Sequence, residues 1–245
     1  MSLALTHAKY QFLEGVRMPI AVIGAAFFPA AAMIFFVVPF TADDPIASTY
    51  ATASMITFAL MTTCLFQFGA GIADDRAQAW DPFTRTLPAG PLPRFAGRIL
   101  CGLAFMVISM IPLLVIAAAA TEAHITPLRF VASAGAVAVV AVVFTLMGLA
   151  IGYLLPFKAA LAVAQLLFFP LAFGGGLLAA PGQSPGFVEA IAPYLPSRGA
   201  VELMWAAVGD FRVNWLSVGA LGGWLVLLAV VAAWAYRGDQ GRRFR

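Results

Sequence analysis

Charged residues are scarce in this 245-residue sequence. Asp, Glu, Lys and Arg make up 10% of it, whereas hydrophobic residues make up 62% and the mean hydropathy is +0.95. A soluble domain carries about 25% charged residues, so the chain has too little polar surface for a soluble fold. The net charge of +3 comes from cations spread between apolar blocks. This pattern argues against a nucleic-acid-binding protein and is typical of the basic loops of membrane proteins.

Cysteine and histidine are also rare. The two cysteines, Cys64 and Cys101, lie in apolar stretches without C-x-x-C spacing, so neither a zinc site nor a redox pair is expected. No G-x-x-x-x-G-K-[ST] phosphate-binding loop occurs, so we expect no cofactor on this chain and no ATP hydrolysis by it. The first apolar block follows a mostly polar stretch and is too long for the core of a signal peptide.

Six windows contain no Asp, Glu, Lys or Arg, and each is at least 22 residues long. A helix needs about 20 apolar residues to cross the hydrocarbon core of a bilayer. The windows are apolar on all sides, as expected for helices surrounded by lipid or by other helices. The sequence therefore predicts six transmembrane helices, at residues 19–40, 50–72, 99–120, 130–155, 159–180 and 215–236.

The distribution of Lys and Arg predicts the orientation. With the N-terminus inside, only Arg129, Arg198 and Arg212 fall in external segments, and all other Lys and Arg residues fall in cytosolic ones. Cytosolic loops carry an excess of Lys and Arg. Both chain ends are therefore expected in the cytosol.

A long cytosolic connection, residues 73–98, is expected to contain a short helix. Asp81 followed by Pro82 is a helix-start signal, and Pro88 with Gly90 ends the helix after about two turns. The segment presents Arg76, Trp80, Phe83, Arg85 and Leu87. Two interpretations remain open, namely docking into a groove of a soluble partner or contact with lipid headgroups.

A second long connection follows the fifth window. Pro170 and the run Gly174, Gly175 and Gly176 are expected to kink and loosen the helix. Residues 181–214 then hold a short helix before Pro193 and Pro196, and a second one at residues 199–208 that Ser197 is expected to cap. Two helices too short to span favour a re-entrant hairpin. It is interpreted as a gate, with a static lid as the alternative.

Short motifs appear in a fixed order along the chain. The long cytosolic connection contains Asp75-Arg76, Leu87-Pro88 and Gly97-Arg98, and the fifth window continues with Pro170, Phe173, Gly176, Pro185, Pro193 and Pro196. In this order, over nearly the whole chain, the sequence resembles the permease subunits of ABC-2 type ATP-binding-cassette exporters, in particular the drug and antibiotic resistance branch.

The resemblance implies one all-α transmembrane domain over residues 1–245. It has six transmembrane helices, an N-terminal interfacial helix at residues 1–18, the cytosolic coupling helix and the external re-entrant hairpin. It also implies an ABC ATPase subunit that binds ATP and Mg²⁺, and a second permease copy, identical or not, in a bacterial plasma membrane. The residues implied in coupling to the ATPase are Asp75, Arg76, Asp81, Phe83, Arg85 and Leu87.

By the same resemblance, the first, second and fifth windows would face the dimer axis. The implied substrate pathway comprises Phe66, Gln67, Gln165, Phe168 and Phe169. For the two glutamines, hydrogen bonding between helices is the alternative. The gate would comprise Pro170, Gly174, Gly175, Gly176, Pro193 and Pro196.

The implied function is outward movement of a hydrophobic or amphiphilic substrate, which is a drug, an antibiotic or a lipid. Two alternatives remain. A lipid-modifying membrane enzyme would use Asp74, Asp75 and Asp81 to bind a cation, but Arg76 and Pro82 interrupt that set. An ion-coupled transporter usually has ionisable residues within its spans, and the six windows have no Asp, Glu, Lys or Arg.

Overall fold

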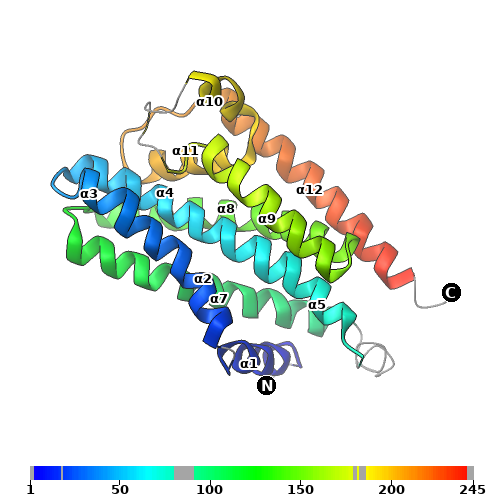
Figure 1. Cartoon of the computed structure of the whole chain (residues 1–245). Helices are drawn as coiled ribbons and strands as arrows, with labels where there is room; N and C mark the ends of the chain where they lie inside the picture. Colours follow the sequence, from blue (N-terminus) through cyan, green and yellow to red (C-terminus); the bar gives the residue numbers. More distant parts are fainter. Residues whose placement is uncertain (1–2, 18, 80–90, 179–180, 182–185, 242–245) are drawn as a thin grey trace.

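A computed structural model describes residues 3–17, 19–79, 91–178, 181 and 186–241 (Figure 1). Over these ranges the chain is helical, with turns and short irregular links and without strands. In chain order the elements are α1 (Leu3–Arg17), α2 (Pro19–Ala32), η1 (Met33–Val37), α3 (Val38–Thr41), α4 (Pro45–Thr63), η2 (Cys64–Ala70), α5 (Gly71–Ala77), α7 (Pro91–Ala120), α8 (Pro127–Leu154), α9 (Phe157–Gly174), α10 (Gly186–Ile191), η3 (Ala192–Tyr194), α11 (Pro196–Val208) and α12 (Trp215–Gly241).

Five helices of the described residues are long and apolar enough to cross a membrane. They are Pro45–Ala77, Phe95–Ala120, Pro127–Leu154, Phe157–Gly174 and Trp215–Asp239. The all-helical fold and these five spans agree with the sequence prediction. In the region of the first predicted span, residues 19–40, the structure shows a shorter apolar helix, Ala26–Thr41. The count of six therefore stays a prediction.

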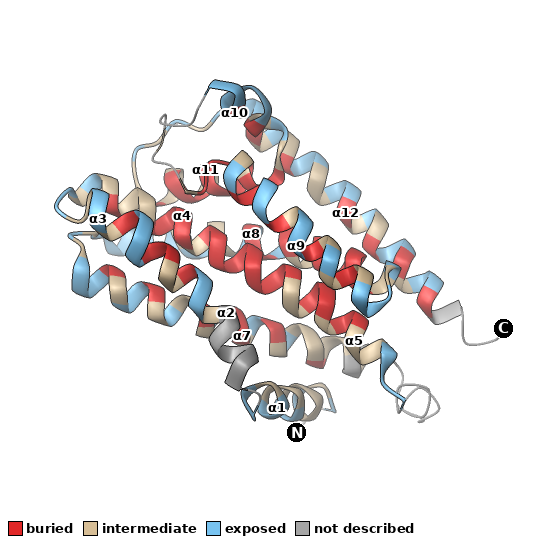
Figure 2. Cartoon of the chain, in the orientation of Figure 1, coloured by how far each residue is buried: buried red, intermediate tan, exposed pale blue. Residues whose placement is uncertain are grey.

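The helix that begins at Pro45 lies at the centre of the bundle. In its most apolar window 78% of the residues are buried, against 22% in the last span. Figure 2 shows the buried residues gathered along α4, whereas α12 is largely exposed. Asp44 caps α4 by accepting hydrogen bonds from the backbone N–H groups of Ile46 and Ala47 at 2.8 and 3.0 Å. The central span thus begins at an Asp-Pro pair, a start signal visible in the sequence.

Two π-helical segments interrupt the first two apolar helices. In η1, the N–H of Val38 donates to the carbonyl of Met33, five residues earlier. Pro39 has no N–H that could donate a hydrogen bond to the carbonyl of Phe35. Because this bond cannot form, the wider turn is favoured. In η2, the N–H of Gly71 likewise donates to the carbonyl of Phe66. Such bulges alter which side chains the next turn presents, and the windows gave no sign of them.

The two ends of the bundle differ in structure. The ends of α5 and α12 lie at one end, and α3, α10 and α11 lie at the other (Figure 1). We call these the α5 end and the α11 end. Helix α1 lies against α7 near the α5 end. A Cβ at Gly97 would come within 2.6 Å of His7 Cβ and 3.0 Å of the Ala4 carbonyl oxygen. The glycine of Gly97-Arg98 thus lets α1 cross α7 closely.

Three sequence expectations between α9 and α11 were wrong: where α9 ends, what the glycines do, and which residue caps α11. Helix α9 ends at Gly174 rather than at residue 180, and it continues through Pro170. Gly176 has φ of 72°, and the N–H of Leu177 donates to the carbonyl of Ala172 at 3.0 Å. The glycines therefore form a Schellman end that terminates the helix cleanly instead of loosening it. Ser197 does not cap α11, because α11 begins at Pro196 after Leu195 and has no side-chain cap.

Candidate functional site

Arg76, on α5, binds two other helices at the α5 end. Its Nε donates to Asp239 Oδ1 of α12 at 2.9 Å, and its Nη2 lies 2.8 Å from the same oxygen. Its Nη1 donates to the carbonyls of Gly152 and Leu155 at 2.8 and 3.2 Å. The last carbonyls of a helix lack intrahelical partners and favour a cation. Arg76 therefore joins the end of α8 to the end of α12.

Asp75, the preceding residue, pairs in another direction. Its carboxylate forms a salt bridge with Arg98 near the start of α7. Adjacent residues of one motif thus hold α5 to α7 on one side and to α8 and α12 on the other. We call these four residues, Asp75, Arg76, Arg98 and Asp239, the charged junction.

Aromatic side chains lie beside the charged junction. The ring of Tyr236, on α12, is centred 5.4 Å from that of Phe95 and 5.2 Å from that of Tyr153. The Arg76 guanidinium carbon lies 6.0 Å from the centre of the Tyr153 ring. Aromatic pairs in such tilted or edge-to-face contact add about 0.5–1.5 kcal/mol each to the burial of the rings. They hold α7, α8 and α12 together where the ion pairs meet.

Of the residues expected to couple to an ATPase, Asp75 and Arg76 lie in the charged junction. Both contact neighbouring helices, and Arg76 has only 16% of its side chain exposed. The other four, Asp81, Phe83, Arg85 and Leu87, lie outside the described residues. Sequence reasoning missed Asp239, which gave no signal beyond its position three residues after Tyr236, on the same face of a helix.

Within the described ranges, no group of three or more His, Cys, Asp or Glu side chains is arranged to hold a metal ion. Asp75, one of the three acids considered as a cation site, pairs with Arg98 instead. Asp81 lies outside the described residues.

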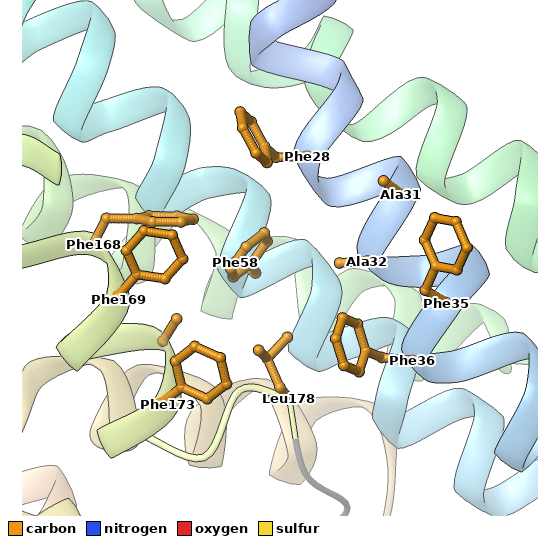
Figure 3. A pocket seen from close by; sticks show the side chains of 11 residues that line it. Phe28, Ala31, Ala32, Phe35, Phe36, Phe58, Phe168, Phe169, Phe173 and Leu178 are labelled. Atoms are coloured by element: carbon orange, nitrogen blue, oxygen red, sulfur yellow. The ribbon is translucent and has the colours of Figure 1, made fainter.

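An apolar groove of about 230 Å³ lies between three parts of the bundle (Figure 3). One part is α2 together with η1, the second is α4, and the third is α9. Every side chain that lines it is Phe, Ala or Leu. Its phenylalanines are Phe28, Phe35, Phe36, Phe58, Phe168, Phe169 and Phe173. The groove thus combines the first, second and fifth apolar windows, the three expected to face the dimer axis.

The expected pathway residues fall partly in this groove. Phe168 and Phe169 line it, and the Phe66 ring is centred 6.3 Å from that of Phe168. Gln67 is half-buried and Gln165 is exposed, and neither lines the groove. The phenylalanines are therefore brought together, and the glutamines are not.

A buried ionic cluster holds α11 to α12 at the other end. Glu202 is 1% exposed, and its Oε1 accepts from Arg198 Nε at 2.7 Å and from Ser217 Oγ at 3.2 Å. Its Oε2 accepts from the backbone N–H of Asn214 at 2.8 Å. Arg198 was expected in an external segment, and its pairing with Glu202 was not predicted. Their spacing of four residues was the available signal.

Apart from Pro170, which lies within α9, the expected gate residues lie around α11. Pro193 is in η3, and Pro196 is the first residue of α11. A Cβ at Gly175 would overlap the hydroxyl of Ser197, so the end of α9 packs directly on α11. Trp205 of α11 donates from Nε1 to Ser54 Oγ of α4 at 2.8 Å. The short helices are thus anchored to the central span.

A bundle of apolar helices with no strand in its described part defines a multi-pass membrane protein. The model of the ABC-2 type transporter family matches residues 3–208, so the chain belongs to that family. It is also similar to the Bacillus subtilis (strain 168) protein named "Putative transport permease YvfS", with 22% identity over 184 residues that cover 75% of each chain.

Family membership makes the chain a transport permease of an ABC transporter rather than an enzyme. It also implies an ABC ATPase as partner. The charged junction, the apolar groove and the α11 cluster are therefore parts of a transport subunit.

Proposed function

We propose that this chain is the membrane-spanning subunit of an exporter powered by a separate ATPase that carries the ATP and Mg²⁺. The single observation that carries the proposal is the match to the transporter family over residues 3–208. The sequence contains no phosphate-binding loop of its own, which agrees with hydrolysis on a partner. Closure of two ATPases would then move two permeases as rigid bodies.

We propose that the ATPase docks on the loop that follows α5, through Asp81, Phe83, Arg85 and Leu87. Support comes from the charged junction, because Asp75 and Arg76 fix the helix that leads into this loop. Phe83 lies between Arg76 and Arg85 in the sequence, and an apolar side chain flanked by basic residues suits a groove on a soluble subunit. Asp75 and Arg76 would act by holding the loop in place.

We further propose six spans, with the first formed by α2, η1 and α3. Both ends of the chain would lie in the cytosol of a bacterial cell and the α5 end would face inward, as the Lys and Arg bias requires. Helix α1 would rest on the inner membrane surface. The α10–α11 segment would then be the external re-entrant gate.

We propose that a second permease, identical or paired, packs against the face that contains the apolar groove. Phe35, Phe36 and Phe173 are more than half exposed beside it. A pathway of Phe and Ala side chains suits amphiphiles such as drugs, antibiotics or lipids, which would move outward. Its lack of charged groups disfavours transport driven by an ion gradient.

Co-purification with a co-expressed ABC ATPase tests the docking proposal. Phe83→Asp places a charge where an apolar anchor is expected, and we expect about a tenfold loss of bound ATPase, as for an interface hot spot. Phe187→Asp is the matched control, because Phe187 is 73% exposed on α10 at the α11 end. Equal ATPase recovery with both variants would refute docking at this loop.

A further inference from the structure

Asp239 occupies an unusual place for a carboxylate. It lies in the last turn of α12, after the apolar stretch of the final span, with only 7% of its side chain exposed. Arg237, two residues earlier, is exposed. Asp239 is therefore directed into the bundle, where its carboxylate pairs with Arg76.

The pair fixes an arrangement of helices, whatever it adds to stability. Burying two opposite charges costs desolvation that their attraction repays only with good geometry, so a buried ion pair is weak evidence for stability. Here the geometry is specific. Two nitrogens of Arg76 contact one oxygen of Asp239, while the third reaches the carbonyls of Gly152 and Leu155. Three helix ends are thereby held in one arrangement.

The location of the pair indicates what it orients. Arg76 lies one residue before the end of α5, and α5 leads into residues 80–90. The neighbouring Asp75 is held by Arg98 of α7. The end of α5 is therefore fixed from two sides, and Asp239 supplies the acid on the α12 side.

We propose that Asp239 is a positioning residue for energy coupling. Through Arg76 it fixes the exit of α5, so that a push on the loop by the ATPase moves α8 and α12 instead of bending the loop alone. This inference rests on the proposed function, because it requires an ATPase at the loop. It adds a residue of the last span to the machinery that transmits the ATPase movement.

The first test measures the orientation of α5 without any ATPase. A nitroxide label is placed at Ala77→Cys, an exposed position at the end of α5, after Cys64→Ala and Cys101→Ala remove the native thiols.

In nanodiscs of phosphatidylethanolamine and phosphatidylglycerol, Asp239→Asn is expected to increase the mobility of the label. Asp239→Glu, which keeps the charge, is expected to restore most of the original spectrum. Arg237→Gln, a change of charge of equal size and opposite sign at an exposed site on the same helix, is the control and is expected to leave the spectrum unchanged.

The second test uses the full permease–ATPase complex in the same nanodiscs. We expect Asp239→Asn to reduce permease-dependent ATP hydrolysis about tenfold, within the range for mutations that alter coupling. The amount of ATPase that co-purifies should stay within about twofold, because the docking residues are intact. Asp239→Glu is expected to recover the rate, and Arg237→Gln to leave it unchanged.

Two results would overturn the inference alone. One is an Asp239→Asn variant with the original label mobility and the original ATP turnover. The other is a loss of turnover that only follows a loss of folded permease or of bound ATPase, because that loss would show a structural role. If ATP hydrolysis does not depend on the unmutated permease, both the proposed function and the inference fail.

Discussion

Glycines on α8 set how closely the central span packs. A Cβ at Gly148 would overlap the carbonyl oxygen of Cys64, and one at Gly152 would overlap that of Phe68. The spacing of four residues places both glycines on one face of α8. Small residues at this spacing let membrane helices approach closely. The π-turn of η2 fits against α8 for this reason.

Replacing Gly152 by alanine tests this packing. The added methyl group meets backbone atoms that cannot rotate away, so we expect a loss of about 1–3 kcal/mol in the free energy of unfolding. The measurement is the melting temperature of the purified permease in detergent. Gly135→Ala on the same helix is the control, because a Cβ there would meet no side chain beyond its chain neighbours and no other helix within 4 Å. Equal melting temperatures would show that the close approach is not required.

The charged residues show what a sequence reveals and what it hides. The Lys and Arg bias predicts the orientation of the spans, but not which charges are buried. Glu202 is buried because α11 packs against α4, α8 and α12, and such contacts between distant segments leave no local pattern. Asp239 was missed for the same reason, since its partner Arg76 is 163 positions away.

At the level of elements, the charge-free windows placed the starts of two helices too late, at residues 50 and 130. Asp44 with Pro45, and Thr126 with Pro127, mark the starts of α4 and α8. The glycine run was recognised, but its effect was not. It ends α9 through the left-handed φ of Gly176, because glycine adopts this conformation without a steric penalty.

The apolar groove supports a prediction about assembly. Ala31 lines the groove, and Ala31→Trp would fill part of it. If a second permease packs there, the extra volume is expected to weaken association about tenfold, as overpacking typically does. Counting photobleaching steps of labelled permease in nanodiscs measures the fraction of dimers.

Ala138→Trp is the matched control for this experiment. Ala138 is exposed on α8 and does not line the groove, so the same side chain should leave the dimer fraction unchanged. Size-exclusion chromatography verifies that both variants are folded. A dimer fraction that Ala31→Trp does not lower would place the second permease elsewhere.

For the whole molecule, composition predicted the class of protein and the windows predicted five of the described spans. The way these helices pack could not be predicted, because helices that are apolar on all sides have no stripe to mark a buried face. The central position of α4 depends on close contacts such as those of Gly148 and Gly152 with η2. Such contacts are visible only when the helices are assembled.

Transport by reconstituted vesicles tests the central claim most directly. The permease is placed in liposomes with and without its partner ABC ATPase, and movement of fluorescent amphiphiles, including a labelled phosphatidylethanolamine, is followed. We expect movement only with the ATPase, ATP and Mg²⁺ together, and none with an ATPase that cannot hydrolyse ATP. Movement by the permease alone, driven by an imposed proton or sodium gradient, would contradict the account.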